Sequence, residues 1–303
     1  MGDTADLYHL LDLQLVKSPD AEVEFKTKPV GRLVMNDEVQ PFGPSAQMVN
    51  MDIGNCSYNR RVEKAFYDTD LKAKDAVLGL YKDDVMISKI QKAFSVGAFG
   101  LKKNRKFVPT RWSITAVDDT ISKNMMDYTK DYPLINEFRV YEHNKLDNRW
   151  IVLMLPREWC YELIEAWYPK TLWNPDAVNT SIFSDHEFYD GRKTYAEIGG
   201  CYYASRLAVN ELLNREMKQA GVVVMREAHP GYIMPVGVWN VREAVRAAVK
   251  GRPNTFATLD ESLNYISKKM DIPIKQWIKS SSVLRDTLQQ KKIIDFLRMK
   301  EWK

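Results

Sequence analysis

The stretch Ile135-Asn-Glu-Phe-Arg-Val-Tyr-Glu-His143, with the Asn144-Lys-Leu-Asp-Asn148 and Arg149-Trp-Ile-Val-Leu-Met-Leu155 that follow it, decides the fold class of this chain. Its first and last parts are rich in β-branched, aromatic and other apolar residues, which is the composition typical of strands. The five residues between them are of the kinds that favour tight turns. The sequence therefore predicts a β-hairpin over residues 135–155.

Further strands and helices are expected on both sides of this hairpin. Gly221-Val-Val-Val-Met-Arg226 is typical of a short strand buried inside a sheet, and residues 21–28 alternate as a strand does. Because strands and helices do not alternate strictly, we expect a mixed α/β (α+β) fold in which helices flank a central, partly antiparallel sheet. Helical periodicity predicts helices over 61–66, 71–81, 85–99, 201–219, 241–249, 258–270 and 274–297.

The composition is that of an ordinary globular protein, and it excludes several classes. Of the 303 residues 45% are hydrophobic, and the net charge of +4 permits contact with nucleic acid without requiring it. No apolar stretch approaches the ~20 residues of a membrane span, and no secretion signal begins the sequence. The cysteines Cys56, Cys160 and Cys201 form no CxxC pair, so a cysteine zinc site is not expected. We expect a soluble cytoplasmic protein.

The last fourteen residues contain a pattern typical of a docking peptide. Gln290, Ile293, Phe296 and Leu297 resemble the box with which replication and repair proteins bind the sliding clamp, PCNA. One helical turn would place the three apolar residues on one side as a compact plug, with the Gln290 amide at its edge. An ordinary amphipathic C-terminal helix has the same spacing, so that interpretation stays open.

A basic segment precedes the hairpin. Its cations would neutralise backbone phosphates, and the adjacent tryptophan would stack on an unpaired base. The alternative is a solvated basic turn beside a core tryptophan. The candidate nucleic-acid-binding residues are Lys102, Lys103, Arg105, Lys106, Arg111 and Trp112.

Two candidate catalytic groups follow from the carboxylates near this segment and from one histidine. Asp118 and Asp119 are expected at the end of a strand over residues 114–117, where they could hold a divalent metal together with Glu137. The alternative is that the two aspartates cap a helix. His229, with Glu227 as its partner, follows a buried strand and could act as a general acid or base, or else have a structural role.

Longer motifs are similar to a known family. The chain resembles the archaeal Nre family of DNA-repair proteins over roughly residues 20–300, and we identify it as a member on these motifs. They are Pro41-Phe-Gly-Pro-Ser45, Asp68-Thr-Asp-Leu-Lys-Ala73, Leu101-Lys-Lys-Asn-Arg-Lys-Phe-Val-Pro-Thr-Arg-Trp-Ser-Ile-Thr-Ala-Val-Asp-Asp-Thr-Ile-Ser122 and His229-Pro-Gly-Tyr-Ile-Met-Pro-Val-Gly-Val-Trp-Asn-Val-Arg-Glu243.

The resemblance implies a DNA-repair role, a clamp-binding box at residues 290–297, and a two-part organisation. We expect a short region 1–60, an N-terminal-type region 61–195 and a C-terminal-type region 196–303. Family members commonly carry a cysteine-rich N-terminal segment of the zinc-binding type, which has no counterpart before Cys56.

Three hypotheses for the body of the protein remain. It is a DNA-binding repair factor recruited by the clamp and associated with the nucleoid, a metal-dependent enzyme acting on DNA or a nucleotide, or a non-catalytic adaptor that joins the clamp to another repair protein.

Overall fold

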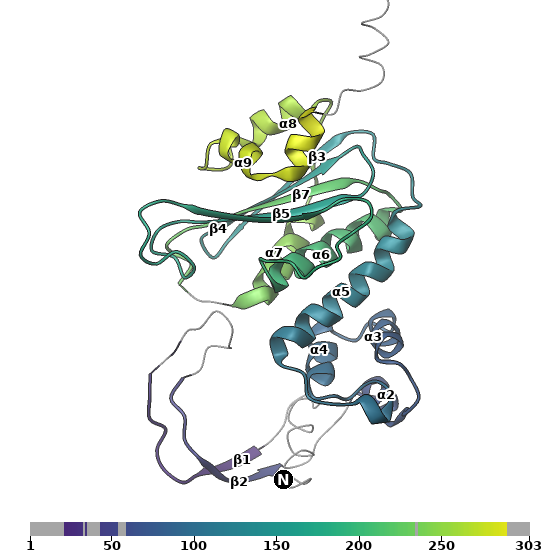
Figure 1. Cartoon of the computed structure of the whole chain (residues 1–303), viewed down its shortest axis with the longest axis vertical. Helices are drawn as coiled ribbons and strands as arrows, with labels where there is room; N and C mark the ends of the chain where they lie inside the picture. The colour runs from purple at the N-terminus through teal and green to yellow at the C-terminus, as the bar shows by residue number, and fades with distance from the viewer. Residues whose placement is uncertain (1–20, 33, 35–42, 54–58, 234–235, 290–303) are drawn as a thin grey trace, which may run out of the picture. The chain divides into compact units, whose positions relative to one another are not determined.

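The computed structural model describes residues 21–32, 34, 43–53, 59–233 and 236–289. The chain divides into two compact units, Met1–Ile121 and Ser122–Lys303, and each is described by itself. Figure 1 shows their elements along the chain.

The first unit combines a two-stranded sheet with several helices. Strands β1 (Ala21–Phe25) and β2 (Met48–Ile53) pair antiparallel, which confirms the strand expected from the alternation after residue 20. The Asn59 side chain accepts hydrogen bonds from the first backbone N–H groups of the next helix and so caps its N-terminus. The helical elements that follow are α2 (Arg60–Tyr67), α3 (Ala73–Lys82), α4 (Ile87–Ser95), the short 3-10 helix η1 (Lys102–Asn104) and α5 (Thr110–Thr129).

Helix α5 corrects the expectation of a strand over residues 114–117. It is one helix of 20 residues that begins in the first unit and ends in the second. The β-branched run around Ile114 favours a strand by residue preference alone. However, Val117 and Ile121 are both buried, and their spacing of four residues places them on one face of a helix. Burial of that face decided the structure against the local preference.

The second unit is built on a six-stranded sheet with the order β6-β5-β7-β4-β3-β8. Strands β5 and β7 are parallel, and all other neighbours are antiparallel. The strands are β3 (Phe138–Lys145), β4 (Asn148–Leu155), β5 (Cys160–Trp167), β6 (Ser181–Glu187), β7 (Gly221–Ala228) and β8 (Asn254–Phe256).

The predicted hairpin is confirmed as β3 and β4. Its two turn residues, Leu146 and Asp147, both have φ of 53°. Two consecutive residues with positive φ form the kind of tight turn whose twist matches that of the strands. Strands β5 and β6 were not predicted, because the aromatic-rich region 156–192 lacks the alternation that marks a half-buried strand.

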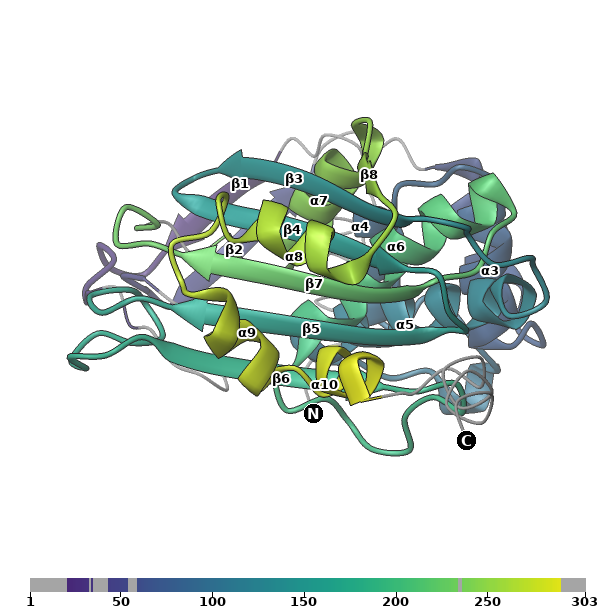
Figure 2. The ribbon, with the colours of Figure 1, turned by 90° about the horizontal axis from the view of Figure 1, so that it is seen from above.

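Helices cover both faces of this sheet (Figures 1 and 2). One core cluster joins the sheet to α6 (Gly200–Glu216) and α7 (Gly237–Lys250), and a second joins it to α8 (Leu259–Ile266), α9 (Ile274–Ser280) and α10 (Ser282–Gln289). The predicted class, helices flanking a central and partly antiparallel sheet, is therefore confirmed.

The single helix expected over residues 274–297 is wrong at Ser281. There the chain leaves α9, and α10 begins under the buried carboxylate of Glu162 on β5. That carboxylate accepts hydrogen bonds from the backbone N–H groups of Ser282 and Val283, 2.8 Å and 3.1 Å long. A buried acceptor at the start of a helix compensates its unpaired N–H groups, so a break here is stable.

Candidate functional site

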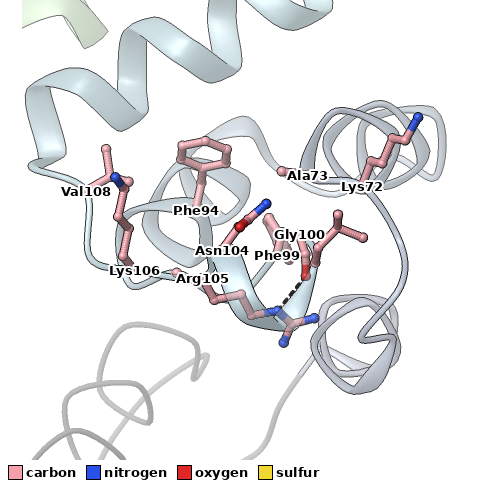
Figure 3. Close-up of a pocket in the computed structure, with 11 residues that line it drawn as sticks. Lys72, Ala73, Phe94, Phe99, Gly100, Asn104, Arg105, Lys106 and Val108 are labelled. Carbon is pink, nitrogen blue, oxygen red and sulfur yellow. Dashed lines mark hydrogen bonds between the residues drawn. The ribbon is translucent and has the colours of Figure 1, made fainter.

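The basic segment forms the turn between α4 and α5, and one of its cations holds the turn together. The Arg105 guanidinium donates to the backbone carbonyls of Gly100, Phe66 and Asp68, at 2.7, 2.5 and 2.6 Å. Figure 3 shows the first of these bonds. With three of its five donors directed at backbone carbonyls, Arg105 has a structural role in this turn, and its expected contact with a DNA phosphate stays a prediction.

The same turn carries three lysines. Lys102, Lys103 and Lys106 are all exposed, and no salt bridge involves them within the part of the chain that the structure describes. Arg111 and Trp112 lie in the first turn of α5, where the Trp112 side chain is 51% exposed. The alternative of a core tryptophan is therefore wrong, because the indole presents part of its flat apolar face at the surface.

Asp118 and Asp119 lie in the middle of α5 and neither end a strand nor cap a helix. Asp118 is fully buried, and its carboxylate accepts a 2.8 Å hydrogen bond from the Gln91 amide on α4. Glu137 immediately precedes β3 and forms an ion pair with Arg139, which also reaches Glu216. Asp118 and Asp119 belong to the first unit, whereas Glu137 lies in the second. The metal site expected from Asp118, Asp119 and Glu137 therefore stays a prediction.

A different cluster forms at the carboxyl ends of the parallel strands β5 and β7. His229 directly follows β7, and its Nε2 lies 3.4 Å from a carboxylate oxygen of Glu227, the partner expected from the sequence. Asp271, in the loop between α8 and α9, joins them, so that one ligand atom from each residue lies within 4.8 Å of the others. Sequence reasoning missed Asp271, because it lies far along the chain in a loop without a motif.

The cluster is built on a buried carboxylate. Glu227 is fully buried and accepts backbone N–H groups of Asp271 and Ile272, at 3.2 Å and 2.8 Å. Arg149 forms an ion pair with Asp271, and this hydrogen bond raises the pKa of the Arg149 guanidinium. These contacts fix Glu227 and leave one edge of His229 and Asp271 toward solvent.

The opposite face of the same strand ends carries a buried ion pair that sequence reasoning did not find. Arg226 on β7 and Glu165 on β5 are 2.7 Å apart, and Arg226 also donates to the Asn148 amide oxygen. The rings of Trp150, Trp167 and Tyr232 surround the guanidinium, whose carbon lies 4.9, 4.6 and 5.2 Å from their centroids. Burial alone lowers the pKa of Arg226, but the charge and hydrogen bond of Glu165, together with the smaller effects of Cys201 and Tyr232, make the net shift upward. The unit thus keeps a charge in its core by pairing it fully.

Other expectations have simple outcomes. Cys160 and Cys201 are free thiols, and burial raises the pKa of the Cys160 thiol to about 11. Within the described residues, no helix has the length and apolar character needed to cross a bilayer. Gln290, Ile293, Phe296 and Leu297 lie outside the described residues, as do Cys56 and part of the 41–45 motif.

The fold and these sites define a mixed α/β protein with a lysine-bearing turn in one unit and a carboxylate–histidine cluster on the sheet of the other. Models of the N-terminal and C-terminal parts of archaeal Nre proteins match residues 10–174 and 187–296. The chain therefore belongs to the archaeal Nre family, as the sequence motifs indicated.

Curated relatives carry the same family name. DNA repair protein NreB of Archaeoglobus fulgidus is 41% identical over 276 residues, which are 90% of this chain and 70% of that protein. NreA of the same organism is 35% identical over 86% of this chain and 66% of its own length. NreA of Haloferax volcanii is 33% identical over 82% of this chain and 60% of its own length. No solved structure matches the chain.

Proposed function

We propose that this protein acts in DNA repair and holds DNA through the lysines of the turn 101–109. The names of three relatives, each a DNA repair protein, support the pathway. The observation that carries the DNA contact is the exposure of Lys102, Lys103 and Lys106 on a turn fixed by Arg105. A rigid turn presents its cations at little further cost in conformational entropy when they meet phosphates.

The interaction with DNA is electrostatic in kind. Each lysine that neutralises a phosphate releases counterions, so affinity falls as salt rises. Trp112, half exposed at the start of α5, adds a flat apolar surface near the same cations in the sequence. Such a surface stacks on unpaired bases without reading their identity.

The test is the salt dependence of binding to a DNA duplex. For the variant K102S/K103S/K106S, we expect the slope of log K against log salt to become shallower by about 0.9 for each phosphate that is no longer neutralised. The matched control is K268S/K275S/K279S, which removes three exposed lysines of the second unit. Equal slopes for both variants would show that this turn does not bind DNA, and would favour the adaptor hypothesis.

We further propose that Gln290, Ile293, Phe296 and Leu297 dock the chain onto a sliding clamp. The support is the spacing of these residues, which directly follow α10. A short peptide buries little area, so an affinity on the order of micromolar is expected for one site, raised by avidity on a ring with several sites. Calorimetry with the cognate clamp tests this proposal by comparing the full chain with a chain that ends at Gln289. Equal binding by both chains would show that residues 290–303 are not the docking peptide.

A second candidate function rests on the cluster of Glu227, His229 and Asp271. Its three side chains offer one nitrogen and two carboxylates, a donor set suited to a divalent cation, at the strand ends where α/β proteins often place ligands. As an enzyme acting on DNA or a nucleotide, the protein would use this group in place of Asp118 and Asp119. Binding of Mn²⁺ measured by equilibrium dialysis should then be lost in H229A and kept in H186A. Absence of Mn²⁺ binding in the unaltered protein would remove this candidate.

A further inference from the structure

A pocket of about 320 Å³ lies in the first unit, where the turn 101–108 faces the start of α3 and the end of α4. Figure 3 shows the side chains that line it. The volume falls within the roughly 300–1,000 Å³ of small-molecule sites. The pocket belongs to the same turn that carries the exposed lysines, so a DNA strand held by those lysines passes close to its mouth.

The pocket is held open by its backbone. Gly97 has a φ of 72°, and a Cβ there would meet the carbonyl oxygen of Lys106 at 2.7 Å. The turn therefore packs directly on this glycine. Two bonds fasten the far end of the turn to α4, from the Val108 N–H to the Ser95 carbonyl and from the Ser95 hydroxyl to the Val108 carbonyl, 2.8 Å and 2.7 Å long. A pocket formed in advance loses little entropy on binding.

One wall of the pocket is aromatic and apolar. Phe94 is only half buried, and its ring lines the pocket together with Phe99, Leu101 and Val108. A phenylalanine ring that faces a pocket is a stacking surface for a flat ligand, and every nucleobase has such a face.

A polar group lies beside this wall. The exposed Asn104 side chain lines the pocket together with Phe94, and Figure 3 shows it in the middle of the lining residues. Among the residues that the structure describes, none is hydrogen-bonded to the Asn104 amide. An amide both donates and accepts, which matches the paired donors and acceptors on the edge of a base.

The rim of the pocket is positively charged. Lys72 and Lys106 line it on opposite sides in Figure 3, and none of the described lining residues is acidic. Arg105 also lines the pocket, but its guanidinium is bonded to backbone carbonyls and shapes the wall. Two flexible ammonium groups beside an aromatic wall complement a base that carries phosphates on both sides.

We propose that this pocket accepts one unstacked nucleotide of a DNA strand. The base stacks on Phe94 with its edge on Asn104, and Lys72 and Lys106 hold the flanking phosphates. This inference rests on the proposed function, because the lysines of the turn must first hold DNA. The inference adds that the protein distinguishes a base outside the base stack from a base inside it. A base that is already unpaired costs least to insert, so bulged or damaged sites are preferred.

The experiment compares two DNA duplexes, one fully paired and one with a single bulged adenine. The unaltered protein should bind the bulged duplex more tightly. For N104A we expect this preference to fall about fivefold, the effect of removing one hydrogen bond. For F94L, which keeps an apolar wall without a ring, we expect a similar or larger loss. In both variants affinity for the paired duplex should stay unchanged. The matched control is N264A, an exposed asparagine of the second unit.

The outcomes separate the two proposals. An equal preference in N104A, F94L and the unaltered protein would overturn the pocket while DNA binding by the lysines stands. Failure of the unaltered protein to bind either duplex would overturn both. The mononucleotide dAMP is a third probe. If it binds in a manner sensitive to N104A and no duplex preference exists, the pocket is a site for a free nucleotide and the DNA part of the inference is wrong.

Discussion

The ring of Tyr168 stacks on the ring of His229, with centroids 4.3 Å apart and planes inclined by 21°. Each residue is the first after one strand of the parallel pair, Tyr168 after β5 and His229 after β7. Burial, together with the charges of Glu227 and Asp271, raises the pKa of the Tyr168 phenol to about 12. The phenol is therefore neutral over the physiological range, and the stack places a flat, uncharged face against the histidine.

The variant Glu227→Gln should destabilise the second unit. Both carboxylate oxygens of Glu227 accept backbone N–H groups, and the glutamine NH₂ would face one of these donors. Leaving a buried N–H unpaired costs about 1–3 kcal/mol in the free energy of unfolding. Urea denaturation measures the change. The control Glu243→Gln alters a partly exposed ion pair and should cost less than about 1 kcal/mol.

Replacing Arg226 by Met should lower the free energy of unfolding more than any single substitution at the surface. It leaves the Glu165 carboxylate buried without its partner, for which about 3–5 kcal/mol is expected. Thermal and urea unfolding provide the measurement. Arg252→Met, at an exposed position, is the control. The double variant with Glu165→Met should recover much of the loss, since no charge then stays unpaired; a double variant no more stable than Arg226→Met would contradict the assigned pairing.

Arg105→Lys should loosen the turn that carries the lysines proposed to bind DNA. A lysine ammonium cannot reach three carbonyls in the planar arrangement that the guanidinium provides. We expect amide hydrogen exchange to speed up across residues 97–109, with little change in the second unit. Arg60→Lys, an exposed change on α2, should leave the exchange pattern as it is. Unchanged protection in Arg105→Lys would show that the turn is held by other contacts.

Stability should fall as the pH drops below about 6.5. Burial, and then the charge of Lys145, lowers the pKa of His143, and burial followed by Arg192 lowers that of His186. A histidine whose folded pKa lies below its unfolded value of about 6.5 binds protons more readily when unfolded. The contribution of such a histidine to stability is complete above pH 6.5, and it is lost as the pH falls from there toward the pKa of the folded state. Between pH 7.5 and 5.5, H143Q/H186Q should lose less in melting temperature than the unaltered protein; an equal loss would assign the effect to other groups.

The fold was predictable where local chemistry decides it. The β3–β4 hairpin follows from turn residues between two apolar runs, and Gly221–Arg226 from its unbroken apolar character. Helix α5 was not predictable in this way, because its β-branched residues favour a strand and only burial against other elements favours the helix. The break at Ser281 depends on Glu162, which lies 119 residues earlier in the chain.

The candidate sites show the same division. The Glu227–His229 pair lies within three residues and was expected, whereas Asp271 joins it through tertiary structure alone. The lysines of the basic turn were found from its composition. The sequence did not indicate that Arg105, in the same turn, is bonded to three backbone carbonyls. The ion pair of Arg226 and Glu165 was not predictable from the sequence, because it forms only when β5 and β7 lie side by side in the sheet.

The turn of the β3–β4 hairpin also supports the loop that carries His229. Asp147 accepts the His229 N–H on its carbonyl and the Gly231 N–H on its carboxylate, and a Cβ at Gly231 would lie 2.6 Å from that carboxylate. Positions 147 and 231, 84 residues apart, are therefore not free to vary independently. A relative that carries a larger residue where this chain has Gly231 should carry a shorter one where it has Asp147. Covariation between these two positions among relatives would then be the evolutionary trace of the contact between the hairpin and the loop.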